Sequence, residues 1–217
     1  MPGTNVELSK NELELVSSSE FILTKNRIIE KVYNLFGDLS ESYKTMLLQQ
    51  QEFLPGEIYK ASPKIYKGEN YLSLPYVMMD YPRTFLKQDV FAIRCFFWWG
   101  NYFSITLQLS GKYLDRYKHS IAQNLKATTE DNYFICVNEN EWQHHFEESN
   151  YQLLSQTNIE LILQKPFVKL AKRLALNEWN NALEFFEENY GNILKLISYP
   201  NGETDLSPGF PKVLTDL

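Results

Sequence analysis

Two features of residues 91–109, FAIRCFFWWGNYFSITLQL, could take part in ligand binding or catalysis and not only in packing. Arg94 is a lone cation among aromatic and aliphatic residues, and a guanidinium can hold a carboxylate or a phosphate through two parallel hydrogen bonds. Small polar residues recur at every second position in Ser104, Thr106 and Gln108, where they offer hydroxyl and amide groups. This stretch therefore contains the first candidates for a ligand-binding site.

The same stretch predicts a β-hairpin, because apolar residues alternate on both sides of the turn dipeptide Gly100-Asn101. A two-residue turn pairs Arg94 with Leu107 and assigns Arg94 to a core face. The other face then mixes aromatic and polar side chains: Cys95, Phe97, Trp99, Tyr102, Ser104, Thr106 and Gln108. A four-residue loop would leave each side chain on the same face, whereas a three-residue loop would move the side chains of one strand to the opposite faces.

The mixed face has two interpretations. Ligand cavities are largely apolar with a few placed polar groups, so Arg94 and the mixed face form a candidate site for a small apolar or carboxylate-bearing ligand. Alternatively, exposed Phe97, Trp99 and Tyr102 need a cover, which another part of the chain or a second copy in a homodimer would supply. The pattern is compatible with both.

Arg94 needs a counter-charge if it is buried, because an isolated charge in a core costs far more than one hydrogen bond returns. Carboxylates are available at several positions: Asp80, Asp89, Glu184, Glu187 and Glu188. A closed pocket that holds Arg94 without a carboxylate would favour anchoring of a ligand or substrate. A fully paired Arg94 under a filled sheet face would remove the pocket hypothesis.

Catalytic and cofactor motifs are absent from the sequence. The three histidines, His119, His144 and His145, have no HExxH spacing, and Cys95 and Cys136 do not form a CxxC pair. There is no GxSxG nucleophile elbow, no GxxxxGK[ST] phosphate loop and no GxGxxG dinucleotide motif. We therefore expect neither a metal ion nor a cofactor.

Two classes of function remain. The favoured class is a non-catalytic binding or interaction protein, which uses the aromatic sheet face for a small apolar ligand or for self-association. The alternative is a small-molecule enzyme with Arg94 as its anion anchor and with Asp80, Tyr102 or a histidine as acid or base. The missing motifs and the scarcity of histidines favour the first class.

Charge and composition narrow the range of partners. The chain has 217 residues, a net charge of −6 and a pI of about 5.2, so we expect it to bind neither nucleic acid nor an anionic membrane surface. No apolar run is long enough to span a membrane, and the polar N-terminus does not resemble a signal peptide. The small number of cysteines is typical of a reducing cytoplasm, where we expect the protein to be located.

One α+β domain over residues 1–217 accounts for the order of the predicted elements. An antiparallel sheet of about five or six strands, built from hairpins, is packed by an N-terminal helical hairpin and by long C-terminal helices. The helical hairpin covers 18–52 with its turn at Gly37, and the later helices cover 112–126, a segment that begins at Pro166, and 179–197. Strands are expected at 64–66, 71–80, 133–137 and in the central hairpin. Residues 141–147 fit a strand or one helical turn, while residues 1–17 and the Pro/Gly-rich tail 200–217 are expected to be irregular.

Overall fold

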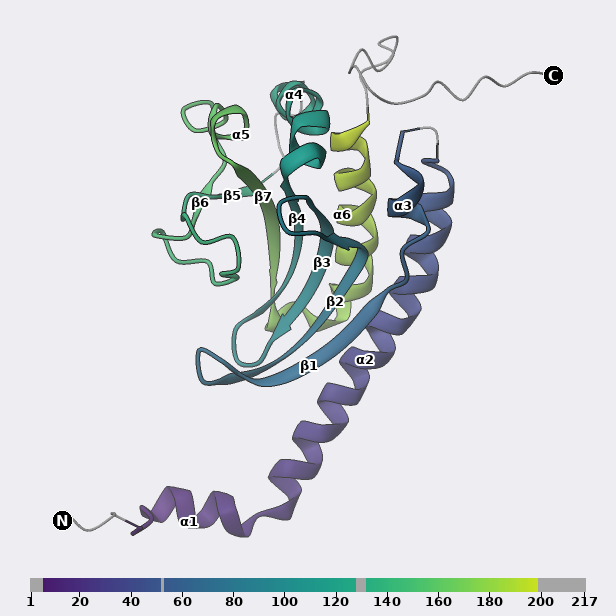
Figure 1. Cartoon of the computed structure of the whole chain (residues 1–217). Helices are drawn as coiled ribbons and strands as arrows, with labels where there is room; N and C mark the ends of the chain where they lie inside the picture. The colour runs from purple at the N-terminus through teal and green to yellow at the C-terminus, as the bar shows by residue number, and fades with distance from the viewer. Residues whose placement is uncertain (1–5, 52, 128–131, 199–217) are drawn as a thin grey trace.

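The computed structural model describes residues 6–51, 53–127 and 132–198, and over these residues the chain is an α+β protein (Figure 1). One antiparallel sheet has the strand order β1-β2-β3-β4-β7-β5-β6, so the described residues form seven strands where five or six are expected. The strands are β1 (Lys64–Tyr71), β2 (Leu74–Phe85), β3 (Val90–Trp98), β4 (Tyr102–Ser110), β5 (Phe134–Cys136), β6 (Tyr151–Leu153) and β7 (Phe167–Ala175). The predicted fold class is confirmed.

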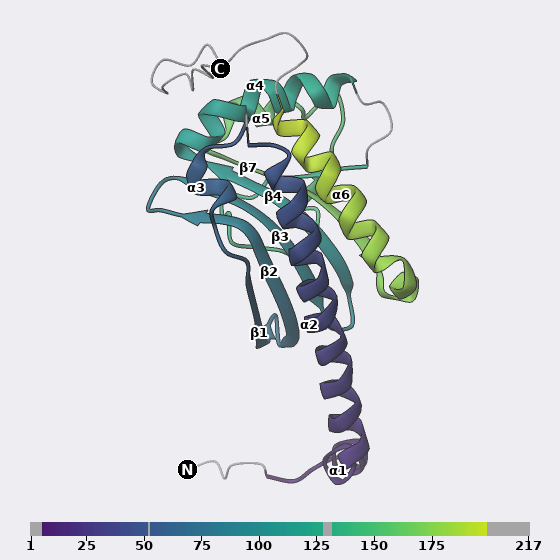
Figure 2. The same cartoon turned by 90° about the vertical axis from the view of Figure 1, so that its right-hand side faces the viewer.

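The long helices pack on one face of this sheet, which we call the core face (Figure 2). α2 (Ser19–Leu48) and α6 (Ala182–Ile197) lie against each other, and α4 (Gly111–Ala127) packs beside α6. The rings of Tyr43 on α2 and Tyr190 on α6 stack with centroids 3.5 Å apart, which joins the two helices above the sheet. The other helices are α1 (Lys10–Ser17), α3 (Gly56–Tyr59), α5 (Leu161–Gln164) and the short 3₁₀ helix η1 (Leu176–Asn181). None of the described helices is long and apolar enough to cross a membrane.

The N-terminal helical hairpin predicted over 18–52 is wrong, because α2 continues without a break through Gly37. The apolar stripe of α2 keeps a spacing of three or four residues on both sides of this glycine: Ile29, Val32, Phe36, Leu39, Tyr43 and Leu47. A glycine inside a helix costs only about 1 kcal/mol relative to alanine. Burial of the continuous stripe outweighs that cost.

The prediction of an irregular segment over residues 1–17 is wrong for residues 10–17, which form α1. The Glu12 backbone N–H donates to Ser9 Oγ at 3.3 Å, and the Ser9 backbone N–H donates to Glu12 Oε2 at 2.8 Å. This reciprocal pair is a capping box, which satisfies two amides that the helix leaves without partners. The predicted irregular tail 200–217 lies outside the described residues.

The helix predicted from Pro166 is wrong as well, since residues 167–175 form β7 and pair with β4. A short apolar run such as that of Val168, Leu170 and Leu174 fits a buried strand or a buried helix, and periodicity alone does not separate the two. Pairing with β4 decides the outcome and places Lys169 directly opposite Gln108.

The central hairpin is confirmed, but its register differs from the predicted one. Three residues join β3 to β4, namely Trp99, Gly100 and Asn101, and Gly100 has a φ of 74°, in the region that favours glycine. Arg94 therefore pairs with Thr106 and not with Leu107. A shift of one residue moves the side chains of one strand to the opposite faces.

This register redistributes the predicted site residues between the two faces. Arg94 shares its face with the polar row, so that face contains Arg94, Phe96, Trp98, Tyr102, Ser104, Thr106 and Gln108. Cys95 and Phe97 lie on the core face, and Trp99 lies in the turn and packs against the core. The predicted combination of Cys95, Phe97 and the polar row on one face is therefore wrong.

Candidate functional site

The loop between β5 and β6 lies on the side of the sheet away from α2 and α6 (Figure 1). We call this loop, residues 137–150, the lid, and the sheet face beneath it the lid face. Residues 141–147 within the lid are irregular, so they form neither the strand nor the helical turn that the sequence suggested. An irregular loop can remain over a sheet only if its backbone polar groups find partners.

Two side chains of β4 hydrogen-bond to the lid, one to its backbone and one to a side chain. Tyr102 Oη donates to the His144 carbonyl at 3.2 Å, and Gln108 Nε2 donates to Glu141 Oε2 at 2.9 Å. The other two members of the row, Ser104 and Thr106, are buried nearby. Of the two interpretations of the polar residues, the structure shows a cover made by another part of the same chain.

Arg94 is paired with Asp80, one of its predicted partners, because β2 and β3 place the two residues opposite each other. Arg94 Nε donates to Asp80 Oδ1 at 2.6 Å, and Nη2 donates to Oδ2 at 3.1 Å. Both side chains are buried. Burial by itself would lower the pKa of Arg94, but the Asp80 carboxylate outweighs it and the pKa is raised. The guanidinium therefore already holds a carboxylate of its own chain.

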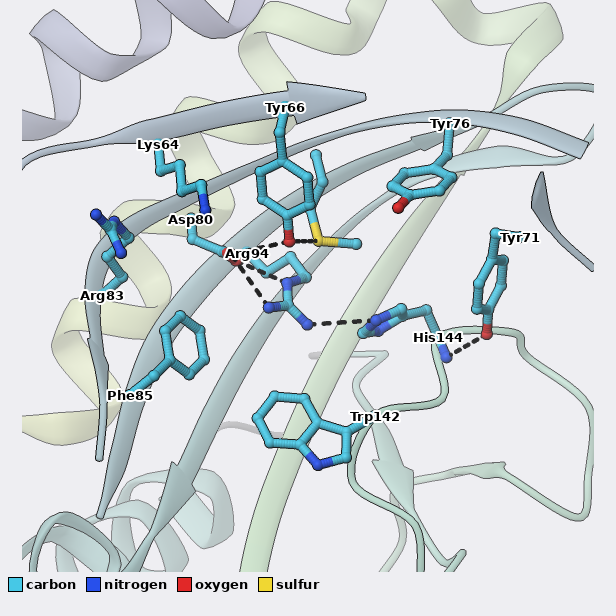
Figure 3. A pocket seen from close by; sticks show the side chains of 11 residues that line it. Lys64, Tyr66, Tyr71, Tyr76, Asp80, Arg83, Phe85, Arg94, Trp142 and His144 are labelled. Atoms are coloured by element: carbon cyan, nitrogen blue, oxygen red, sulfur yellow. Dashed lines mark hydrogen bonds and ion pairs between the residues drawn. The ribbon is translucent and has the colours of Figure 1, made fainter. Parts of the chain in front are cut away.

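The half-buried His144 on the lid contacts this ion pair (Figure 3). Its Nε2 lies 3.3 Å from Arg94 Nη1, and since a guanidinium only donates, Nε2 accepts and the ring is neutral. Burial lowers the pKa of His144 well below its ordinary value, and the charges of Arg94 and Lys169 lower it further. Asp80, Arg94 and His144 thus connect β2, β3 and the lid.

Lys169 on β7 is a second buried cation under the lid, which the sequence prediction missed because it assigned this segment to a helix. Lys169 Nζ donates to the Gln143 carbonyl, and no carboxylate of the described residues lies within ion-pair distance of it. Burial lowers the pKa of Lys169 to about 7. A lysine whose charged form is disfavoured by burial therefore ties the lid to the sheet.

An open pocket of about 400 Å³ remains between β1, β2 and the lid (Figure 3). Aromatic side chains form much of its wall: Tyr66, Tyr71, Tyr76, Phe85 and Trp142. The other lining residues are Lys64, Met78, Asp80, Arg83, Arg94 and His144. Of the eight residues predicted to bind a ligand, Arg94 alone lines this pocket. The aromatic residues of β1 and of the lid escaped prediction because they are far from β3 and β4 in the sequence.

Lys64 and Arg83 give this pocket an excess of positive charge. Neither side chain has a carboxylate within ion-pair distance among the described residues. Arg83 Nε donates to the Ser62 carbonyl at 3.3 Å, and Lys64 Nζ lies 5.3 Å from the centroid of the Tyr66 ring. These two cations can attract an anion locally although the whole chain has a net charge of −6.

Cys95, Phe97 and Trp99 do not reach the pocket. Cys95 is buried on the core face, its Sγ lies 3.4 Å from Tyr43 Oη, and burial raises the pKa of its thiol. Phe97 meets the ring of Trp179 edge to face with centroids 5.9 Å apart. In the part of the chain that the structure describes, no three His, Cys, Asp or Glu residues are grouped so that they could hold a metal ion.

The fold and the site together define an α+β protein with an aromatic, positively charged pocket beside a buried ion pair. Comparisons with models of protein families, with curated proteins and with solved structures find no match to this chain.

Proposed function

We propose that this protein binds a small anionic molecule with a flat apolar body in the pocket between β1, β2 and the lid, and that it does so without catalysis. The observation that carries the proposal is an aromatic wall beside two cations, Lys64 and Arg83, that have no carboxylate partner in the described chain. Aromatic walls bind flat apolar groups through large contact areas and offset stacking. The cations would attract the acid group of the ligand and fix its orientation.

In this proposal, the role of anion anchor passes from Arg94 to Lys64 and Arg83. Arg94 uses two of its nitrogen atoms for Asp80 and a third for His144, so it has little capacity left for a ligand. The buried pair instead holds β2 and β3 in a fixed arrangement. A preformed pocket reduces the entropy that is lost when a ligand orders its surroundings.

The enzyme alternative receives less support from the same geometry. A general acid or base must come within hydrogen-bond reach of the substrate. Asp80 faces Arg94, the accepting nitrogen of His144 faces Arg94 too, and the Tyr102 hydroxyl donates to the lid outside the pocket. The low pKa of His144 also makes it a weak base at neutral pH.

Replacing both rim cations should weaken binding of an anionic aromatic probe and leave a neutral probe unaffected. Anilinonaphthalene sulfonate and phenylnaphthylamine make a matched pair, since they share an aromatic framework and differ in the sulfonate. In the double variant Lys64→Met and Arg83→Met, we expect the Kd of the sulfonate to rise at least about tenfold, because a hydrogen bond to a charged group contributes about 1.5–3 kcal/mol. Fluorescence titration measures both affinities.

The control for this prediction is Lys44→Met, which removes an exposed positive charge on α2 outside the pocket. An equal loss of sulfonate affinity in this control would mean that net charge, and not the pocket, attracts the probe. Native mass spectrometry of the protein purified from its own host complements the titration, because it reports the mass of any ligand that stays bound.

The aromatic wall should contribute to both probes. Trp142 is 50% exposed, and its ring centroid lies 6.1 Å from that of Phe85, so the two rings flank the pocket. In Trp142→Ala we expect roughly tenfold weaker binding of both probes, because aromatic contacts contribute about 0.5–1.5 kcal/mol beyond the area that they bury. Thermal unfolding should change little. The control is Leu48→Ala on α2, an exposed leucine outside the pocket, which should leave both affinities unchanged. Unchanged affinity of Trp142→Ala for both probes would argue against this pocket as the binding site.

A further inference from the structure

The N-terminal arm, residues 6–28, extends beyond the sheet (Figure 2). It contains α1 and the beginning of α2, and none of its residues is buried. Its exposed apolar side chains are Val6, Leu8, Leu13, Leu15, Val16, Phe21, Ile22 and Leu23. Clustered apolar exposure of this extent is uncommon on monomeric proteins and marks an interaction surface.

α1 in particular needs a packing partner. It has only eight residues, and isolated helices shorter than about 12–15 residues are marginal in water. Most helical stability in proteins comes from packing of an apolar face, yet α1 has no buried residue. A second surface that covers Leu13 and Val16 would supply the missing contacts.

Two hollows flank α2 where the arm joins the body. One, of about 430 Å³, is lined by Asn26, Ile29, Glu30, Tyr33 and Lys67. The other, of about 260 Å³, is lined by Lys31, Leu35, Trp179, Asn180, Ala182 and Leu183. Ile29 follows Phe21 by eight residues, so the first hollow lies about 12 Å along the helix from the exposed apolar cluster.

Charge is distributed unevenly between the tip of the arm and these hollows. Residues 6–20 contain four acidic side chains and one basic one: Glu7, Glu12, Glu14, Glu20 and Lys10. The first hollow contains Lys67 together with Glu30, whereas the second contains Lys31 and no acidic residue, and Lys31 forms no ion pair with a described residue. The acidic tip and the lysine of the second hollow are therefore complementary in charge.

We propose that this arm pairs with the arm of a second copy of the chain. In an antiparallel arrangement about a two-fold axis, α1 of each copy packs into the second hollow, beside α2 of the other copy. Such an interface is self-complementary, because the protruding apolar side chains, the second hollow and the opposite charges all belong to one chain. The acidic tip also disfavours an anionic membrane as the occupant.

Sedimentation velocity over a range of protein concentrations tests the pairing. We expect the wild-type chain to sediment as a dimer and the variant Phe21→Glu with Ile22→Glu to sediment as a monomer with unchanged circular dichroism. The two side chains are 46% and 50% exposed, so the substitutions do not disturb the core. The control is Leu86→Glu with Leu153→Glu, two leucines of similar exposure outside the arm, which should stay dimeric. A monomeric wild type, or an arm variant that remains dimeric, overturns the proposal.

A charge exchange tests the antiparallel arrangement itself. The variant Lys31→Glu has an acidic second hollow and an acidic tip, whereas Glu14→Lys with Glu20→Lys has a basic tip and a basic second hollow. Each variant alone should lose dimer, and an equimolar mixture should regain it as heterodimer. A mixture that stays monomeric overturns the arrangement. Probe binding by the Phe21 and Ile22 variant should match that of the wild type, which separates this proposal from the proposed function.

Discussion

Replacement of Asp80 with alanine is expected to lower the free energy of unfolding by about 3–5 kcal/mol. The substitution leaves the Arg94 guanidinium buried, with the neutral His144 ring as its remaining hydrogen-bond acceptor in the cluster. Arg94 is only 5% exposed, so water cannot readily replace the lost carboxylate. Chemical denaturation followed by circular dichroism measures the change, and its midpoint should shift without a change in the m-value.

Two further variants show whether the cost of Asp80→Ala comes from the unpaired buried charge of Arg94 or only from the loss of one contact. In the double variant Asp80→Leu and Arg94→Met, both charges are absent, and replacement of a buried ion pair by apolar residues is often close to neutral. In Glu160→Ala, an exposed pair with an N–O distance of 3.3 Å to Lys126 is broken, and we expect a loss below about 1 kcal/mol. If Asp80→Ala costs no more than Glu160→Ala, the buried pair does not support the fold as we infer.

Lys169→Met should make the protein more stable at neutral pH. It should also abolish an increase of the free energy of unfolding with pH that we expect for the wild-type protein. The pKa of Lys169 is about 7 in the folded chain against 10.5 as its ordinary value, because burial disfavours the charged amine. Between these two values the unfolded chain binds a proton that the folded chain does not. The free energy of unfolding therefore rises with pH across this window, by up to about 1.4 kcal/mol per pH unit.

Below about pH 7 the folded lysine is charged as well, so the penalty reaches its maximum and no longer changes with pH. Methionine removes the penalty but also the hydrogen bond to the Gln143 carbonyl, which offsets about 1 kcal/mol of the gain. We expect a net gain of a few kcal/mol at pH 7. Denaturation of both proteins at a series of pH values between 6 and 10 gives the difference, in which the titration of other groups cancels.

The exposed lysine Lys44 provides the control for this measurement, since Lys44→Met should leave the pH profile of the wild type intact. A wild-type profile that is parallel to that of Lys169→Met over the whole range would show that Lys169 keeps its ordinary pKa in the folded protein. A large loss of stability in Lys169→Met would show instead that its bond to the lid outweighs the cost of burial.

Local sequence patterns were sufficient where an element depends on its own residues. The turn glycine and the alternating residues around it predict the hairpin of β3 and β4, and the apolar periodicity of α4 and α6 predicts two helices that the structure contains. The same reasoning failed at Gly37 and at residues 167–175. A glycine is a weak helix terminator when an apolar stripe continues past it. A short apolar run becomes a strand or a helix according to the tertiary contacts that are available to it, and here it pairs with β4.

The candidate site shows the same division. The sequence alone identified Arg94 as a cation that needs a carboxylate, and it included Asp80 among the partners, because the cost of burying an unpaired charge holds in any fold. Only the tertiary structure decided the register of the hairpin and therefore the sheet face on which each side chain lies. One residue more or less in the turn moves the side chains of one strand to the opposite face. The pocket itself depends on contacts between residues that are distant in the chain, Tyr66 on β1, Phe85 on β2 and Trp142 on the lid, and no local pattern specifies which distant segments a folded chain brings together.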